Sequence, residues 1–146
     1  MKIRALTVLD TPFLISAKET FPDAWNENMI NSSFKAGNLF GFIAEESVNG
    51  KLSPIGFISY SVNIDTADIA DLFVAETHRK KGVGNALISA FICDAEERGV
   101  KKLFLEVRES NIPAKKLYEK AGFTFLSLRK KYYADGENAL IFVKEL

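Results

Sequence analysis

The feature that most constrains this chain is a basic, glycine-spaced segment, Arg79–Gly84, that joins a strand-like stretch to a helix-like one. Residues 68–74 have the pattern of a strand, and apolar residues recur from Val83 to Arg98 at the spacing of one helix face. The first turn of a helix leaves backbone N–H groups without partners, and the helix dipole adds positive charge there. Glycine has no Cβ, so the backbone can approach a ligand closely at Gly82 and Gly84. The segment therefore predicts an anion site suited to a phosphate or pyrophosphate, although a turn that needs glycine only for its shape has the same pattern.

The charge and spacing of this segment narrow the kind of anion site. Arg79, Lys80 and Lys81 supply attraction at long range. The spacing is not that of a nucleotide phosphate-binding loop, because no Gly-Lys-Ser/Thr is present, and it is not the dinucleotide fingerprint. A nucleotide-binding protein is therefore disfavoured.

The remaining elements alternate between hairpins in the first half of the chain and a β-α-β-α-β series in the second. Asp10 and Asn111 are expected to cap helices, and Asn49-Gly50 predicts a hairpin turn. We expect one α/β (α+β) domain over residues 1–146, with a mixed, mostly antiparallel sheet of about seven strands flanked by about four helices. The expected strands are 2–8, 39–46, 55–62, 68–74, 102–108, 123–129 and 139–143. One expected helix begins at Asp10, and the others run over 26–34, 83–98 and 111–122.

Composition excludes several classes of protein. Hydrophobic residues make up 47% of the 146 residues and charged residues 26%, which are values of a folded globular protein. The 19 Lys and Arg residues balance 19 Asp and Glu residues, which gives no support for attraction of the whole molecule to DNA or an anionic membrane. No apolar run approaches the ~18 residues that a membrane span requires. We expect a cytoplasmic protein, a monomer or weak dimer, with neither DNA nor membrane as a partner.

The cysteine and histidine content argues against a metal cofactor. Cys93 is the one cysteine and His78 the one histidine, which is too few ligands for a zinc site. Cys93 lies in an apolar stretch and is expected to pack in the core. His78 is expected to be a surface residue.

Two further segments complete a resemblance to a known family. The pattern Arg-x-x-Gly-x-Gly at 79–84 resembles the acyl-CoA pyrophosphate loop of the GNAT N-acetyltransferase superfamily. Residues 105–123 and 129–139 look like the bacterial ribosomal-protein alanine N-acetyltransferases within it. The resemblance covers the whole chain and is most specific from Ile69 to Val143. It implies the GNAT fold, with acetyl-CoA as cosubstrate.

The resemblance also assigns residues to the cofactor. The backbone at 72–74 is expected to contact the pantetheine and the acetyl group, where an N–H would polarise the thioester carbonyl. Asn111 is expected to reach the cofactor as well as cap a helix. The set expected at the cofactor comprises Leu72, Phe73, Val74, Arg79, Lys80, Lys81, Gly82, Val83, Gly84, Asn85, Asn111 and Tyr118.

Acetyl transfer to an amine requires proton-transfer groups, because an amine attacks a thioester only when it is neutral. Glu106 lies on a predicted strand beside the cofactor site, and Tyr118 lies in the following helix. By themselves these residues would equally be an exposed glutamate paired with a lysine or arginine, and a packed tyrosine. The resemblance assigns the general base to Glu106 and the general acid to Tyr118. Asp68 and Asp71, on the preceding strand, are alternatives for the base.

The acceptor amine is less constrained than the cofactor. With pKa values of about 8 and 10.4, forming the neutral amine at pH 7 costs about 1 kcal/mol for an α-amino group and about 4.6 kcal/mol for a lysine. The resemblance implies a protein N-terminus, such as that of a small-subunit ribosomal protein, entering beside Trp25, Asp71, Tyr132 and Tyr133. The pattern departs from the family at 22–25 and at Asn138, both near the expected acceptor groove. Acetylation of a small amine or a lysine, and a non-catalytic CoA-binding sensor, remain alternatives.

Overall fold

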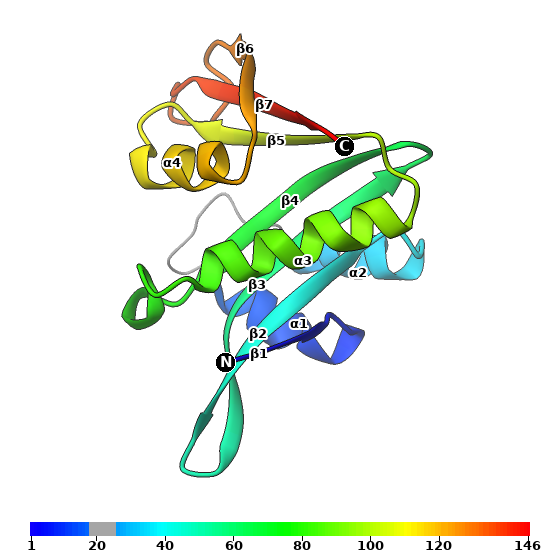
Figure 1. The fold of residues 1–146 in the computed structure, drawn as a ribbon, viewed down its shortest axis with the longest axis vertical. Helices are drawn as coiled ribbons and strands as arrows, with labels where there is room; N and C mark the ends of the chain where they lie inside the picture. The colour runs from blue at the N-terminus through cyan, green and yellow to red at the C-terminus, as the bar shows by residue number, and fades with distance from the viewer. Residues whose placement is uncertain (18–25) are drawn as a thin grey trace.

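A seven-stranded sheet with strand order β1-β2-β3-β4-β5-β7-β6 organises the molecule, as a computed structural model of the chain shows (Figure 1). The structure describes residues 1–17 and 26–146. Neighbouring strands are antiparallel except β4 and β5, which are parallel. The predicted mixed, mostly antiparallel sheet is therefore confirmed. The strands are β1 (Lys2–Ala5), β2 (Phe40–Val48), β3 (Lys51–Asn63), β4 (Thr66–Val74), β5 (Lys102–Arg108), β6 (Thr124–Arg129) and β7 (Ala139–Glu145).

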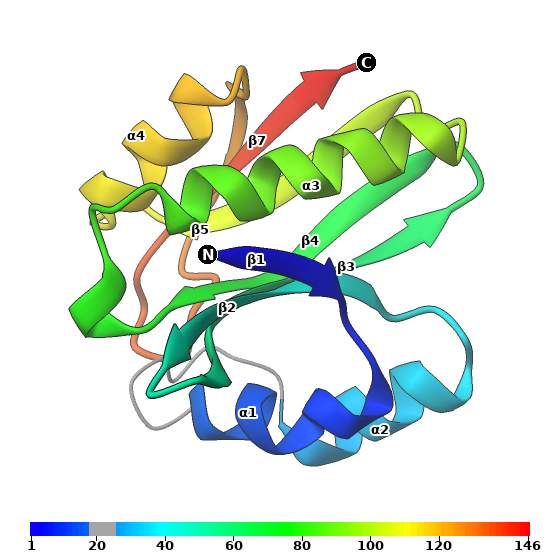
Figure 2. The ribbon, with the colours of Figure 1, turned by 60° about the horizontal axis from the view of Figure 1, so that its bottom comes forward.

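Helices cover both faces of the sheet (Figure 2). Helices α1 (Thr11–Ser16) and α2 (Glu27–Lys35) lie on one face, and α3 (Val83–Glu97) and α4 (Ile112–Lys120) lie on the other. Each face has its own buried apolar cluster, the larger one beneath α3. Across the part of the chain that the structure describes, no helix is both long and apolar enough to cross a membrane.

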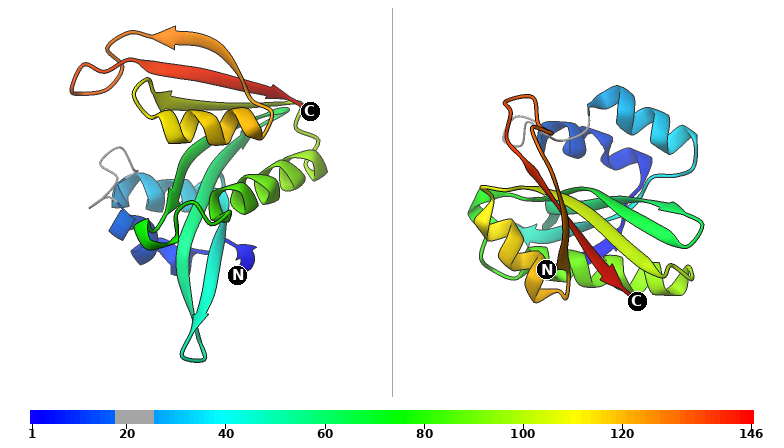
Figure 3. Two further views of the ribbon diagram at one scale, coloured as in Figure 1. Left: turned by 60° about the vertical axis from the view of Figure 1, so that its left-hand side comes forward. Right: turned by 90° about the horizontal axis from the view of Figure 1, so that it is seen from above.

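The sheet splits between β4 and β5. The two strands pair only at residues 66–68 and 102–104, and no further pairing joins the described parts of β4 and β5 beyond that point. A shift in the β3–β4 register between Ser59 and Tyr60 leaves Ala70 of β4 unpaired, and such a bulge bends a strand. Figure 3 shows β5, β6 and β7 diverging from the rest of the sheet. The candidate active site lies in this split between β4 and β5.

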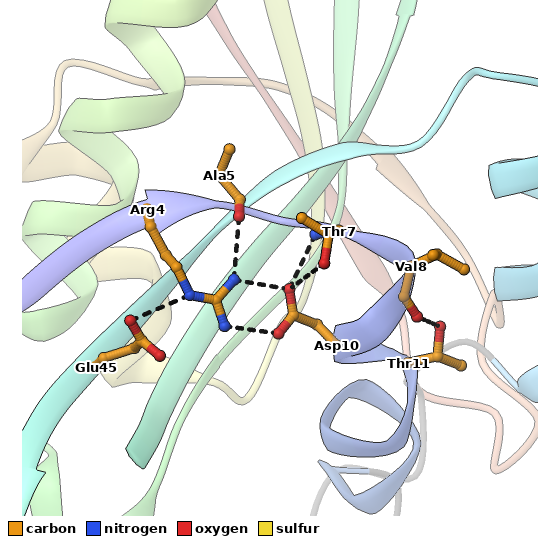
Figure 4. Close-up of polar contacts among 7 residues, drawn as sticks. All are labelled: Arg4, Ala5, Thr7, Val8, Asp10, Thr11 and Glu45. Atoms are coloured by element: carbon orange, nitrogen blue, oxygen red, sulfur yellow. Dashed lines mark hydrogen bonds and ion pairs between the residues drawn. The ribbon is translucent and has the colours of Figure 1, made fainter. Parts of the chain in front are cut away.

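The segment between β1 and α1 differs from the sequence prediction for an electrostatic reason. Asp10, expected to cap α1, makes no capping bond to that helix. Its carboxylate instead pairs with Arg4, at 2.7 Å between Oδ1 and Nη2, and accepts a hydrogen bond from the N–H of Thr7 at 2.9 Å (Figure 4). Arg4 also reaches Glu45 on β2, at 3.1 Å between Nε and Oε1. These bonds turn the chain into a short 3₁₀ helix, η1 (Val8–Asp10), so β1 ends at Ala5 rather than at residue 8.

Cys93 is exposed, so its predicted place in the core is wrong. The buried side chains of α3 include Leu87, Ile88, Phe91 and Ala95. At 3.6 residues per turn, position 93 points away from this stripe. The apolar run around Cys93 therefore belongs to a helix with one buried face rather than to a fully buried helix.

The turn between β3 and β4 holds a strained residue whose replacement is expected to stabilise the protein. Ile64 has a φ of 57° and is 91% exposed. The left-handed conformation costs a non-glycine residue about 1–2 kcal/mol, whereas asparagine tolerates it. We expect Ile64→Asn to raise the free energy of unfolding by about 1 kcal/mol and Tm by about 2–4 °C in calorimetry. Leu9→Asn, at a similarly exposed site without positive φ, is the control, and an equal effect of both substitutions would contradict the strain.

Candidate active site

The split between β4 and β5 holds a cavity of about 1090 Å³. Its walls come from β4, the segment 78–85, β5, the start of α4 and the residues that follow β6. Of the described residues that the sequence predicts for the site, all line this cavity except Lys81. Trp25 lies outside the described residues, as do the neighbouring 22–24.

One end of the cavity is formed by the N-terminus of α3. Gly82 precedes the helix with a φ of 84°, and no side chain caps this end. The N–H groups of Val83, Gly84 and Asn85 lie in the first helical turn, where no helical carbonyl is in reach. Lys80, just before, also has a positive φ, of 60°. This end therefore offers backbone N–H groups and positive charge to an anion, as the sequence predicts.

Gly84 has a packing role in addition to the close approach to a ligand that its sequence context suggests. A Cβ at this position would lie 3.1 Å from Cδ2 of Leu117 on α4. Glycine therefore allows α3 and α4 to pack closely beside the cavity. At Gly82 the left-handed backbone favours glycine, and an added Cβ would meet nothing within 4 Å.

The two residues that precede Lys80 are held by specific contacts. The Nε of Arg79 donates a hydrogen bond to the carbonyl of Val74 at 2.9 Å, which closes the turn between β4 and the loop. His78 is half-buried rather than at the surface, and it lines the cavity. Its Nε2 lies 2.5 Å from Oε2 of Glu46 on β2.

Glu106 lies on β5 where the two strands separate. Its carboxylate pairs with Arg129, at 3.2 Å between Oε1 and Nη1. A hydrogen bond to Glu106 raises the pKa of Tyr132 above its ordinary value. The paired state that the sequence analysis kept as an alternative for Glu106 is thus observed, and the same side chain lines the cavity.

A second carboxylate faces Glu106 across the split. Asp68 pairs in register with Phe104, two residues before Glu106, so Asp68 and Glu106 lie on one face of the sheet. Burial, and then the negative charge of Glu106, raise the pKa of Asp68. Asp71, three residues further along β4, is buried and also lines the cavity. Three carboxylates therefore line the cavity, with Asp68 and Glu106 where β4 and β5 separate and Asp71 nearer the loop.

Tyr118 also lines the cavity. Its side chain is only 6% exposed and its ring packs edge-on against Phe123, with centroids 5.9 Å apart. Burial raises the pKa of Tyr118 well above its ordinary value, and the charges of Asp71 and Tyr133 raise it further. The phenol therefore stays protonated and remains a hydrogen-bond donor at the cavity wall.

Arg108 organises the loop that follows β6, a role that the sequence analysis missed. Its Nη1 lies 2.8 Å from carboxylate oxygens of both Asp135 and Glu137, and its guanidinium lies 4.2 Å from the ring centroid of Tyr133. Glu137 also accepts a hydrogen bond from the N–H of Ser110 at 2.8 Å. Hydrogen bonding from the Ser110 side chain, then from Arg108 and from this N–H, lowers the pKa of Glu137. The acidic residues at 135 and 137 are the sequence feature that could have indicated this contact. Spacing alone does not show that they pair with an arginine 27 positions before Asp135.

Asn138, where the chain departs from the resemblance, stabilises the same loop. Its side-chain oxygen accepts a hydrogen bond from the N–H of Lys131 at 3.0 Å. Its amide nitrogen donates to Glu109 at 3.3 Å. An acidic residue at this position would face Glu109 without a proton to donate, so asparagine suits this chain.

Known proteins resemble this chain in both sequence and structure. A family model described as acetyltransferase (GNAT) family matches residues 5–123. Ribosomal protein bS18-alanine N-acetyltransferase of Escherichia coli K12 is 40% identical over 96 residues, a match that spans 64% of this chain and 64% of that protein's length. The protein of the same name from Salmonella typhimurium is 34% identical over 129 residues, covering 82% of this chain and 87% of that protein. The crystal structure of the Escherichia coli ribosomal-protein-S18-alanine N-acetyltransferase has a TM-score of 0.85 at 31% identity, over 99% of this chain and 92% of that one.

Proposed function

We propose, since the chain belongs to the acetyltransferase (GNAT) family, that it is an acetyl-CoA-dependent N-acetyltransferase acting on the N-terminal amine of a protein. The family match confirms the resemblance seen in the sequence. The observation that carries the proposal is one cavity with an anion-binding helix N-terminus at one end and carboxylates with a buried phenol toward the other. Such a cavity suits a ligand whose phosphates and reacting thioester lie apart.

The loop end suits the pyrophosphate of acetyl-CoA. The N–H groups at the start of α3, with Arg79 and Lys80 beside them, complement the phosphate charges. The edge of β4 that faces the cavity has lost its pairing to β5 after Asp68, so backbone groups at 72–74 other than the Val74 carbonyl, which Arg79 holds, are available to the pantetheine. An N–H there would stabilise the oxyanion that develops on the thioester carbonyl.

The carboxylate end suits the proton transfers of a direct attack in a ternary complex. The amine nitrogen attacks the thioester carbon, the carbon–sulfur bond breaks, and the amine proton passes to Glu106, directly or through water. Tyr118 donates a hydrogen bond to the departing sulfur, which leaves as the thiolate of CoA and takes its proton from solvent. Asp68 is a second proton acceptor on the same face, and its pKa is raised by burial and then by the negative charge of Glu106.

An N-terminal amine is the acceptor that this site favours. Its pKa of about 8 leaves much more neutral amine at pH 7 than a lysine pKa of about 10.4. The relatives named for alanine acetylation of a ribosomal protein support an alanine N-terminus as the first candidate. Tyr132, Tyr133 and Asp71 line the cavity, and we propose that the acceptor chain enters beside them.

Turnover with two peptides tests the acceptor. One peptide begins with a free alanine followed by arginine, and the other has the same sequence with a blocked N-terminus and an internal lysine. We expect thiol release from acetyl-CoA with the free-alanine peptide. Release with the lysine peptide is expected to be at least about tenfold slower, because forming the neutral lysine amine costs more free energy. Release with the lysine peptide alone would contradict N-terminal acetylation. Tight acetyl-CoA binding without release from either peptide would favour a small amine or a non-catalytic sensor.

A further inference from the structure

His78 connects the start of the loop 79–85 to Glu46 on β2, which lies 32 positions earlier in the chain. Its Nε2 lies 2.5 Å from Oε2 of Glu46, and its Nδ1 lies 2.9 Å from Oγ1 of Thr77. The hydroxyl of Thr77 can donate to the neutral ring or accept from the protonated one, while Nε2 donates to the carboxylate in both states. The orientation of the imidazole is therefore fixed from two sides.

A bulge in the β2–β3 hairpin places Glu46 for this contact. Ala44 pairs with Gly56 but Glu45 pairs with Pro54, which leaves Ile55 unpaired. A bulge of this kind re-aims the side chains that follow it. The carbonyl of Ile55 accepts a hydrogen bond from the N–H of Ala75 at 2.8 Å, just where β4 ends. The hairpin therefore holds the entrance of the loop by one backbone bond and one side-chain bond.

The loop that follows is strained and needs such support. Lys80 has a φ of 60°, a conformation that costs a non-glycine residue about 1–3 kcal/mol and persists only when its surroundings hold it. Gly82 follows with a φ of 84°. His78 lines the cavity directly, whereas Glu46 does not. Glu46 can therefore act on the cavity through the imidazole.

We propose that Glu46 is a positioning residue for cofactor binding. By holding His78, it keeps the loop 79–85 in the conformation that presents its backbone N–H groups to the pyrophosphate of acetyl-CoA. This inference rests on the proposed function, because that function places the pyrophosphate at this loop. Glu106 lies on β5 and Tyr118 on α4, outside the loop itself, so the contribution of Glu46 falls on cofactor affinity and not on the chemical step.

Whether a substitution of Glu46 weakens or tightens acetyl-CoA binding separates a positioning role from a purely electrostatic one. The charged groups nearest the imidazole in sequence or by contact are Glu46, Glu76, Arg79 and Lys80. A carboxylate close to an anion site repels the anion, so removing the charge of Glu46 would by itself tighten binding. Positioning predicts the opposite, that loss of the hydrogen bond weakens binding. Glu46→Gln keeps an oxygen acceptor for Nε2 and removes only the charge.

Calorimetric titration with acetyl-CoA, alongside steady-state kinetics, tests this proposal in the whole 146-residue chain. Glu46→Ala is expected to weaken acetyl-CoA binding about tenfold, equivalent to about 1.4 kcal/mol, and to leave kcat within about twofold. Glu46→Gln is expected to bind within about twofold of the wild type. Glu145→Ala, which removes an exposed ion pair with Lys102 at 3.7 Å, is the control and is expected to change neither quantity. Thr77→Val frees the other ring nitrogen and is expected to weaken binding in the same direction as Glu46→Ala.

Two outcomes would overturn the positioning role. One is acetyl-CoA binding by Glu46→Ala as tight as or tighter than wild type, and the other is equal weakening by Glu46→Gln and Glu46→Ala. Failure of the wild type itself to bind acetyl-CoA would overturn the proposed function and this inference together. Thermal unfolding of each variant without ligand separates a folded, weakly binding protein from an unfolded one.

Discussion

Replacing Tyr118 with phenylalanine is expected to lower kcat by about 10²–10³-fold, the usual cost of removing one donor from a developing charge. Because the pKa of Tyr118 lies above its ordinary value of about 10, full proton transfer to a thiolate of pKa about 8.5 is uphill. We therefore expect the hydroxyl to act as a hydrogen-bond donor to the departing sulfur in the transition state. The phenylalanine ring preserves the edge-on packing against Phe123, so acetyl-CoA binding is expected to stay within about twofold of the wild type.

Tyr60→Phe is the matched control for this measurement. Tyr60 is also buried, burial also raises its pKa, and its hydroxyl donates to Asp94 on α3. It does not line the cavity. Loss of its hydroxyl is expected to cost stability but to leave kcat unchanged. An equal fall in kcat for both variants, or an unchanged kcat in Tyr118→Phe, would remove Tyr118 from the proposed mechanism.

The sequence predicts the position of the candidate site because the signals for its loop lie close together in the chain. Glycines, basic residues and the start of a helix stand within a few positions of each other at 79–85, and their geometry follows from the helix N-terminus alone. Glu106 and Tyr118 were predictable through the resemblance, since residue type and spacing by themselves fit a surface pair and a packed ring equally well. Their roles remain predictions for the kinetic tests.

The parts of the site that were missed depend on contacts between distant segments. The contact of His78 with Glu46 joins residues 32 positions apart, and that of Arg108 with Glu137 joins residues 29 positions apart. No periodicity in the sequence encodes either distance. The helix of Cys93 shows the same limit, because an apolar run does not say which of its residues face the core.

Removing the ion pairs of Arg4 with Asp10 and Glu45 is expected to have a large effect on the free energy of unfolding. Arg4→Met would leave two buried carboxylates, Asp10 and Glu45 at 8% and 7% exposure, without their cation. Breaking a buried ion pair from one side costs about 3–5 kcal/mol, and we take the lower end because Arg4 is partly exposed. A loss of about 3 kcal/mol lowers Tm by about 6–12 °C. Lys102→Met, which breaks the exposed pair with Glu145, is expected to cost less than about 1 kcal/mol.

The pH dependence of this loss distinguishes the carboxylate of Asp10 from lost packing. Burial opposes the charged form of Asp10, but the hydrogen bonds from Arg4 and Thr7 outweigh it, so its pKa in the folded protein is lowered. In the wild type, Asp10 therefore contributes stability above its unfolded pKa of about 3.9, and this contribution is lost as pH falls through the lower folded value. Without Arg4, burial is expected to raise the pKa of Asp10, so the variant gains relative stability on acidification. The difference in Tm between wild type and Arg4→Met is expected to narrow between pH 7 and pH ~3, and a constant difference would assign the loss to packing alone.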